Sequence, residues 1–85
     1  MPQIEMYSKL LCSYCSRAKR TLTDLGAKFT AKDITFKPSL RKEMIERSGR
    51  HTVPQIFIDG RHIGGSDDLE DARESGLLNK LLNLQ

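Results

Sequence analysis

The sequence has little of what marks membrane, secreted or disulfide-rich proteins. It contains no tryptophan and only two cysteines, and no apolar run approaches the roughly 20 residues that a membrane span needs. The segment "MPQIEMYSKLL" at residues 1–11 lacks the basic region and the long apolar region of a signal peptide. We therefore expect a cytoplasmic protein in a reducing compartment, with no membrane partner and no permanent structural disulfide.

Basic and aromatic residues are too sparse for a nucleic-acid site. The net charge of +3 is spread along the chain, and the densest basic segments are residues 17–20 and 41–42. A nucleic-acid site usually has a larger basic stripe, often with interleaved aromatic residues, and this chain has two tyrosines and three phenylalanines. We expect solvated helix faces there and no nucleic-acid partner. The length of 85 residues suits one small domain, so we predict a single domain over residues 1–85. We expect this domain to be a monomer.

The pattern of apolar residues predicts an α/β protein with the element order β-α-β-α-β-β-α and a further short helix. Alternation predicts strands, spacings of three and four predict helices, and Asp59-Gly60 predicts a hairpin turn. A strand, a helix and a second strand make a parallel crossover, so helices must cover the sheet. The expected strands are residues 3–8, 28–34 and the two arms of 54–65, and the expected helices are residues 13–25, 38–48, 67–76 and 77–84.

The two cysteines, Cys12 and Cys15, are separated by two residues, which allows several kinds of site. A zinc site would need four ligands, but His51 and His62 lie too far apart and too far from the cysteines for a zinc finger. A structural disulfide would close a loop too short to constrain the unfolded chain much. A pair of inert buried thiols is the third alternative, although Ser13, Tyr14 and Ser16 make the neighbourhood polar.

A redox pair gives each cysteine a distinct role. Cys12 is expected at the start of a helix, where unpaired backbone N–H groups and the helix dipole favour a thiolate. Lys9 and Arg17 can add positive charge nearby. Cys15, one turn into the helix, is expected to be more buried. The sequence therefore predicts that Cys12 is the attacking thiolate and Cys15 the resolving thiol.

Three motifs together resemble those of glutaredoxins: "CSYC" at residues 12–15, "TVPQIFIDG" at 52–60 and "IGGSDDL" at 63–69. The resemblance covers essentially the whole chain. It implies a thioredoxin-like fold, with a four-stranded mixed sheet and helices on both faces. The chain departs from the family pattern at Ser13, where proline is common, and at Ser66, where many bacterial members have cysteine. The first departure bears on redox potential and cluster binding, and the second removes an extra thiol.

The same resemblance implies that glutathione is the co-substrate and that no cofactor is tightly bound. It implies a cis Val53–Pro54 bond facing Cys12, which leaves the Val53 main chain free to pair with glutathione as an added strand would. The N–H groups of Ser66 and Asp67 would bind the α-carboxylate of the γ-glutamyl group, and the Asp67 carboxylate would hold its amino group. Asp67 with Glu70 also fits a capping box, which would serve the helix alone.

The remaining candidates for the glutathione site surround these groups. Lys9 is expected at the glycyl carboxylate, and Arg41 occupies a helical position where related proteins place a polar contact. Tyr14 is expected to line the groove that holds glutathione. Gly65 has no side chain that would block the approach of the γ-glutamyl group, and Thr52 belongs to the segment before Pro54. His51 and His62 are given no catalytic role.

The resemblance thus implies a glutathione-dependent thiol–disulfide oxidoreductase that reduces protein–glutathione mixed disulfides and protein disulfides. A thioredoxin-like reductant served by a flavoprotein is a rival, and the absence of tryptophan before the cysteines argues against it. The other alternative is a carrier of a 2Fe–2S cluster, held between two chains by Cys12 of each and two glutathione thiols. Apart from that use of Cys12, no metal ligand is predicted.

Overall fold

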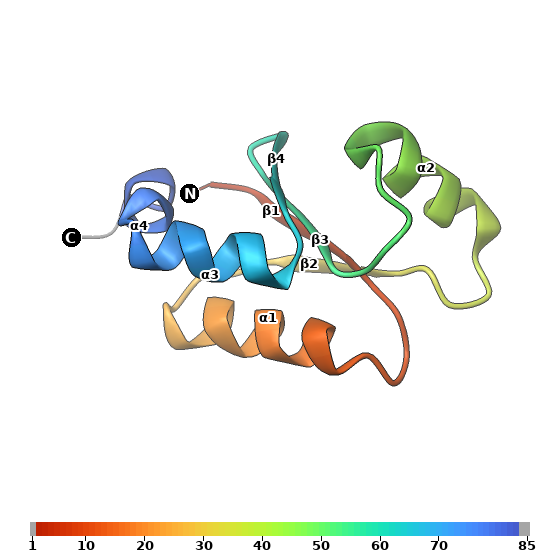
Figure 1. The fold of residues 1–85 in the computed structure, drawn as a ribbon, viewed down its shortest axis with the longest axis horizontal. Helices are drawn as coiled ribbons and strands as arrows, with labels where there is room; N and C mark the ends of the chain where they lie inside the picture. The colour runs from red at the N-terminus through yellow and green to blue at the C-terminus, as the bar shows by residue number, and fades with distance from the viewer. Residues whose placement is uncertain (1, 84–85) are drawn as a thin grey trace.

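The computed structural model describes residues 2–83, which form a four-stranded sheet covered by helices on both faces (Figure 1). The elements follow the predicted order. Most bounds lie within one or two residues of those expected, and Leu84, the last residue of the predicted fourth helix, lies outside the described residues. The elements are β1 (Ile4–Ser8), α1 (Ser13–Asp24), β2 (Thr30–Asp33), α2 (Pro38–Ser48), β3 (Gln55–Ile58), β4 (Arg61–Gly64), α3 (Ser66–Glu74) and α4 (Leu77–Leu81).

The strand order is β2-β1-β3-β4, so β1 lies in the middle of the mixed sheet. The crossover through α1 places β2 parallel to β1, with Ser8 opposite Asp33 at the carboxyl ends of the two strands. Strand β3 is antiparallel to β1, and β4 returns beside β3 through a tight turn. Asp59 and Gly60 both have positive φ there, at 51° and 82°, as a two-residue hairpin turn requires.

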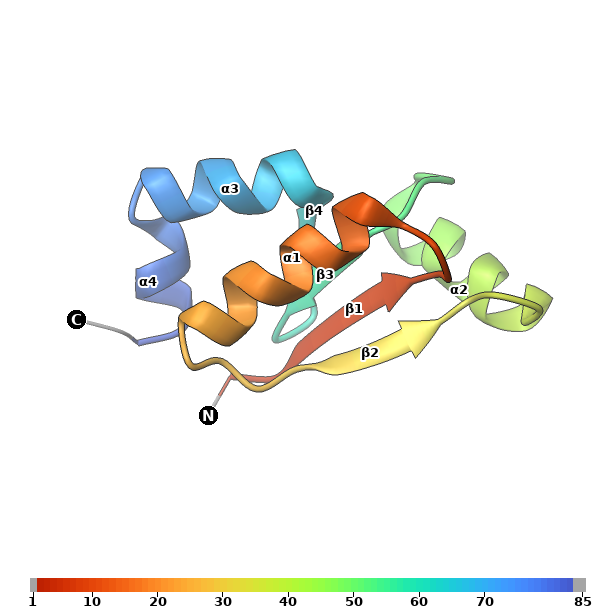
Figure 2. The same ribbon diagram turned by 90° about the horizontal axis from the view of Figure 1, so that it is seen from below.

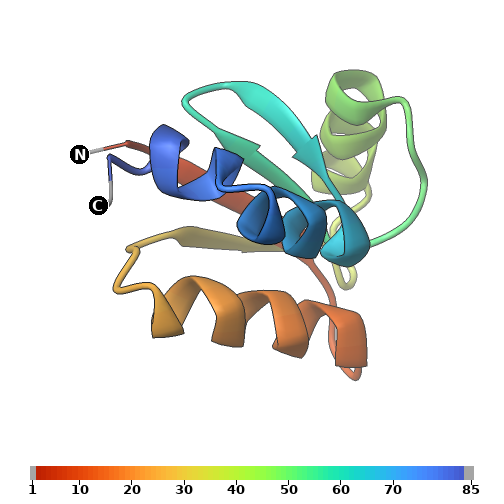
Figure 3. The same ribbon diagram turned by 60° about the vertical axis from the view of Figure 1, so that its left-hand side comes forward.

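Each face of the sheet has its own apolar core, because successive side chains of a strand point to opposite faces. Met6 of β1 packs with Leu22 of α1 and Leu69 of α3, whereas Tyr7 packs with Met44 of α2. Figure 2 shows α1 and α3 over one face, and Figure 3 shows α2 on the side opposite α1. The predicted mixed sheet with helices on both faces is therefore confirmed. Within residues 2–83, none of the helices has the length and hydropathy needed to cross a bilayer.

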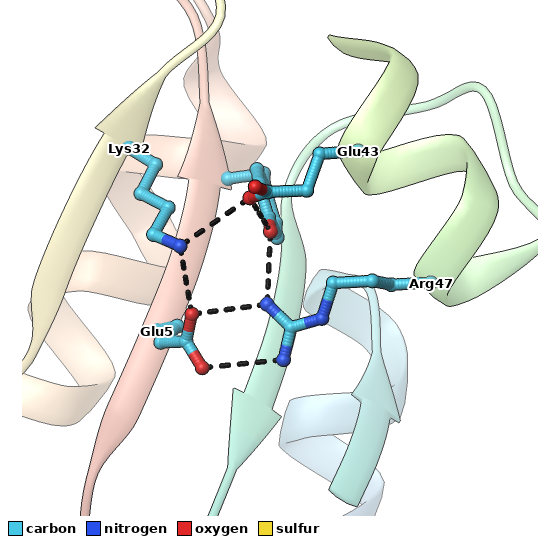
Figure 4. A network of polar contacts seen from close by, with 5 residues as sticks. Glu5, Lys32, Glu43 and Arg47 are labelled. Atoms are coloured by element: carbon cyan, nitrogen blue, oxygen red, sulfur yellow. Dashed lines mark hydrogen bonds and ion pairs between the residues drawn. The ribbon is translucent and has the colours of Figure 1, made fainter. Parts of the chain in front are cut away.

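A network of charged side chains fastens α2 to the sheet (Figure 4). Glu5 of β1 accepts from Arg47 Nη1 at 2.9 Å and lies 2.8 Å from Lys32 Nζ of β2. Arg47 also donates to the Tyr7 hydroxyl and lies over the Phe57 ring, and that hydroxyl contacts Glu43. The hydrogen bonds from Arg47 and then Lys32 lower the pKa of Glu5 to about 2. The network thus holds α2 against the sheet.

Candidate active site

Cys12 is the N-cap residue of α1 and follows the loop that leaves the carboxyl end of β1. Its backbone is extended, with φ −112° and ψ 107°. The Cα atoms of Cys12 and Cys15 are 5.2 Å apart, and a disulfide joins the two residues. Cys12 is partly exposed, whereas only 2% of Cys15 is exposed. The two cysteines therefore differ in access, with Cys12 the one that a substrate can reach.

The start of α1 provides one backbone hydrogen-bond donor to the Cys12 sulfur. The backbone N–H of Cys15 donates to Cys12 Sγ at 3.2 Å, and the N–H of Ser16 donates to the Cys12 carbonyl at 3.1 Å. The first turn of α1 contains no acidic residue that would oppose negative charge. Unpaired N–H groups at a helix start favour a thiolate over a thiol. This arrangement suits a nucleophilic sulfur at Cys12 after reduction of the disulfide.

A groove of about 300 Å³ opens beside the cysteine turn, between the segment before β3 and the start of α3. Its lining includes most of the residues predicted to bind glutathione: Tyr14, Thr52, Val53, Pro54, Gly65, Ser66 and Asp67. It also includes two residues that the sequence did not indicate, Arg50 and Asp68. Lys9 and Arg41 are exposed and are not among its lining residues. The structure therefore brings together three sequence segments that are far apart along the chain.

The segment before β3 presents main-chain groups to this groove. The Val53–Pro54 bond is cis, as the resemblance implied. Among residues 2–83, no group forms a hydrogen bond with the backbone N–H or C=O of Val53. The Thr52 carbonyl, by contrast, accepts from Gln55 Nε2 at 3.1 Å. The Val53 main chain is thus available to a ligand.

Gln55, which the sequence analysis did not select as a site residue, holds the segment before β3 in place through its side-chain hydrogen bonds to Thr52. It is buried, and its side-chain oxygen lies 2.8 Å from His62 Nε2. Because the Gln55 amide group donates to Thr52, its oxygen is the acceptor, and His62 Nε2 carries the proton. Burial lowers the pKa of His62 and so favours this neutral form. A polar residue at the start of the apolar strand "QIFI" was the only sequence signal for this role.

The start of α3 forms the opposite wall of the groove. Gly65 is the N-cap, so Ser66 and Asp67 contribute first-turn N–H groups that no carbonyl within the helix can reach. The predicted capping box of Asp67 with Glu70 is wrong. The N-cap is Gly65, two residues before Asp67, so Asp68 is the residue whose carboxylate accepts from the Gly65 N–H, at 2.9 Å. Glu70 instead accepts from the Thr21 hydroxyl of α1 at 2.6 Å.

The side chains of Asp67 and Ser66 differ in solvent exposure: that of Asp67 is exposed and that of Ser66 is buried. The Asp67 side chain is 89% exposed, with Arg17 Nη1 3.9 Å away, so its carboxylate is free to pair with a ligand cation. The Ser66 hydroxyl is buried and has no hydrogen-bond partner within residues 2–83.

Arg50 and Asp68 connect the two walls of the groove. Arg50 Nη1 donates to Asp68 Oδ2 at 2.8 Å. This bond and the Gly65 N–H lower the pKa of the Asp68 carboxyl below its ordinary value. Asp68 thereby caps α3 and binds Arg50 with the same carboxylate.

Comparison with known proteins agrees with this geometry. Residues 4–63 match the family model of glutaredoxin. Glutaredoxin 3 of Escherichia coli K12 is 50% identical over 82 residues, which are 96% of this chain and 99% of that protein. The solution structure of glutaredoxin from Brucella melitensis is 48% identical, with a TM-score of 0.83, over 94% of this chain and 87% of that one.

A crystal structure of a buckwheat glutaredoxin–glutathione complex is also similar. It is 31% identical, with a TM-score of 0.87, over 94% of this chain and 76% of that one. The redox cysteine pair, the fold and these matches agree over nearly the full length. The chain belongs to the glutaredoxin family of thiol–disulfide oxidoreductases.

Proposed function

We propose that this protein uses glutathione to reduce protein–glutathione mixed disulfides and protein disulfides. The observation that carries the proposal is the position of the partly exposed Cys12 at a helix start, beside a groove with free main-chain groups. The buckwheat relative, whose structure contains glutathione, supports glutathione as the ligand of this groove. We also propose that the chain acts as a monomeric single domain over residues 1–85, in the cytoplasm.

The first half-reaction transfers glutathione from the substrate protein to Cys12. The Cys12 thiolate attacks the glutathione sulfur, a Cys12–glutathione disulfide forms, and the protein sulfur leaves as a thiolate that takes a proton from water. A second glutathione thiolate then attacks the glutathione sulfur on Cys12. Glutathione disulfide leaves, and the Cys12 thiolate is restored. The rate depends on the attacking thiolate fraction, the leaving-group pKa and the alignment of the sulfurs.

Protein disulfides require the second cysteine. Cys12 attacks one sulfur of the substrate disulfide, and Cys15 then attacks Cys12 in the mixed disulfide. The substrate leaves as a dithiol, and the protein is left with the Cys12–Cys15 disulfide, which two glutathione molecules reduce. The backbone distance between the cysteines suits this closure, because Cα atoms 5.2 Å apart lie within the ordinary disulfide range.

Glutathione is proposed to lie along the groove as a short added strand. The Val53 main chain would pair with the cysteinyl residue, and the N–H groups of Ser66 and Asp67 would receive the γ-glutamyl carboxylate. The exposed Asp67 carboxylate would hold the neighbouring amino group. Lys9 and Arg41 would meet the glycyl carboxylate at the other end.

Deglutathionylation of a protein substrate, coupled to glutathione reductase, tests the proposal. We expect Cys12→Ser to abolish turnover, whereas Cys15→Ser should keep activity on glutathionylated protein and lose it on protein disulfides. Thioredoxin reductase supplied in place of glutathione and its reductase should give no turnover. Equal loss in both cysteine variants on a glutathionylated protein would refute the assigned roles.

A further inference from the structure

The large apolar side chains that are exposed within residues 2–83 all lie around the cysteine turn. They are Leu10, Leu11, Tyr14 and Phe36. Leu11 is fully exposed, and Phe36 is 94% exposed. Single exposed apolar residues scattered over a surface need no explanation, but a group of them at one edge marks an interaction site. Tyr14 belongs to the groove described above, whereas Leu10, Leu11 and Phe36 do not line it. We call these three residues the apolar rim.

The apolar rim is built from two loops that are fixed to each other. One loop joins β1 to α1 and the other joins β2 to α2. Both loops follow the carboxyl ends of these parallel strands, at the same end of the sheet (Figure 2). The Leu10 N–H donates to the Thr35 hydroxyl at 2.9 Å, which connects the two loops. The Thr35 N–H in turn donates to Asp33 Oδ1 at 2.8 Å. The rim is therefore an ordered surface next to Cys12.

Two rim residues adopt a backbone conformation that bulky side chains rarely take. Leu11 has φ 55° and Phe36 has φ 58°, both in the left-handed region. Neither side chain recovers that cost by burial, because both are exposed. Strained residues of this kind gather at functional sites, where the surrounding structure holds them in place. Leu11 and Phe36 thus combine a left-handed backbone with an exposed apolar side chain, in the loops next to Cys12.

Exposed cations accompany the apolar rim. Lys9, Lys37 and Arg41 form no ion pair with any side chain of residues 2–83. Lys9 and Arg41 are proposed to meet the glycyl carboxylate of glutathione, so Lys37 is the cation that remains for a substrate polypeptide. Asp33 is the nearby anion, and its carboxylate already accepts from Thr35. A partner at this end of the sheet would therefore meet apolar side chains with the positive charge of Lys37 beside them.

We propose that the apolar rim docks the polypeptide of the substrate, on the assumption that the proposed function holds. The favoured partner is a protein segment with an apolar residue and an acidic residue next to its modified cysteine. A second copy of this chain fits less well, since a face-to-face pair would oppose the same cations. Glutathione would occupy the groove on one side of Cys12, and the substrate chain would lie on the other side. The rim would thus select among protein substrates without contacting glutathione.

Two synthetic glutathionylated peptides and one small mixed disulfide test this proposal. In the first peptide, leucine and aspartate flank the modified cysteine, and in the second, glycine and lysine do. The small substrate is the mixed disulfide of cysteine and glutathione. We expect the wild-type protein to prefer the first peptide. In the double variant Leu11→Ser, Phe36→Ser, kcat/KM for that peptide should fall roughly tenfold, while the small substrate should react as before.

Charge reversal provides a matched control. Lys37→Glu, beside the rim after the carboxyl end of β2, and Lys28→Glu, before the amino end of that strand, change the net charge equally. Only Lys37→Glu should slow the reaction with the leucine–aspartate peptide. The far-ultraviolet circular dichroism of every variant should match that of the wild type.

Several results would overturn the docking surface. Unchanged kinetics of the double variant with the first peptide would do so, as would equal losses with the peptide and the small substrate. A wild-type dimer that the double variant abolishes would assign the rim to a second copy instead. If the wild-type protein turned over none of the three substrates, the proposed function would fail, and the docking proposal with it. Only the docking proposal would fail if the wild-type protein and the double variant turned over the small substrate equally well and the wild-type protein showed no preference between the two peptides.

Discussion

The Arg50 guanidinium lies 2.8 Å from the Asp68 carboxylate and so joins two segments that are separated by β3 and β4 in sequence. One segment leads to the cis Val53–Pro54 bond, and the other begins α3. The same carboxylate accepts from the Gly65 N–H, which fixes the first turn of the helix. The width of the groove therefore depends on this contact.

Loss of the Arg50–Asp68 contact should weaken glutathione binding while leaving the cysteines intact. For Arg50→Ala we expect KM for glutathione to rise about threefold to tenfold, because a partly exposed ion pair contributes on the order of 1 kcal/mol. Arg50→Lys should recover part of that loss. Steady-state kinetics at varied glutathione concentration measure this effect. A fall in kcat at unchanged KM would contradict the role of the contact in shaping the groove.

Asp67 should contribute directly to glutathione affinity. Asp67→Asn removes the charge but keeps the size of the side chain, and KM for glutathione should rise by a few fold. The effect is expected to be modest because the carboxylate is 89% exposed. Asp71→Asn, farther along the same helix, is the matched control and should leave KM unchanged. If Asp67→Asn behaved like the control, the amino group of glutathione would have to bind elsewhere.

The Glu5 network should make stability depend on acid pH. The pKa of Glu5 is about 2 in the folded protein and 4.5 ordinarily, so its contribution is present above pH 4.5 and is lost as pH falls toward 2. At pH 7, Glu5→Gln should lower the free energy of unfolding by roughly 2 kcal/mol. Urea unfolding of both proteins at several pH values measures the difference, which should shrink in acid.

The control for Glu5 is an exposed carboxylate on α2. Glu46 lies 3.9 Å from Lys42 in an exposed pair on α2. Glu46→Gln should change stability by well under about 1 kcal/mol at any pH. A Glu5→Gln effect that stayed constant from pH 7 to acid would show that packing, and not ionisation, is responsible.

Anaerobic reconstitution with iron, sulfide and glutathione distinguishes the oxidoreductase from the cluster carrier. Each chain offers one partly exposed sulfur, since Cys15 is buried, so a 2Fe–2S cluster would need two chains and two glutathiones. Lys37, which bound glutathione would leave unpaired, opposes such a face-to-face pair. We therefore expect a colourless monomer on gel filtration. A coloured dimer that Ser13→Pro abolishes would instead support the cluster alternative.

The sequence predicted the parts of the protein that depend on local pattern. Apolar periodicity located every helix and strand, and Pro38 and the Asp59-Gly60 turn fixed their boundaries closely. The motifs around Cys12, Val53 and Ser66 indicated residues that the structure does bring to one edge. These features could be predicted from the sequence because each depends on neighbours within a few positions along the chain.

Features that depend on tertiary contacts could not be predicted from the sequence. Arg50 and Asp68 are separated by 18 residues, and nothing in either segment indicates that they meet. The capping box was misassigned because two adjacent aspartates, Asp67 and Asp68, fit the pattern from different starting residues. The left-handed backbone of Leu11 and Phe36 has no sequence signal, since those residue types usually avoid it.

The unpaired main-chain groups of the groove have a consequence for mutational scanning. Every residue except proline carries the same N–H and C=O groups, so most replacements at Val53 or Ser66 leave those donors and acceptors in place. A library scored for glutathione use would record tolerance at positions that nonetheless touch the ligand. Proline at Ser66 or Asp67 would behave differently, since it removes the N–H and yet suits the first turn of a helix. A position at which proline alone reduces activity would therefore be one whose backbone N–H binds glutathione, which other substitutions do not reveal.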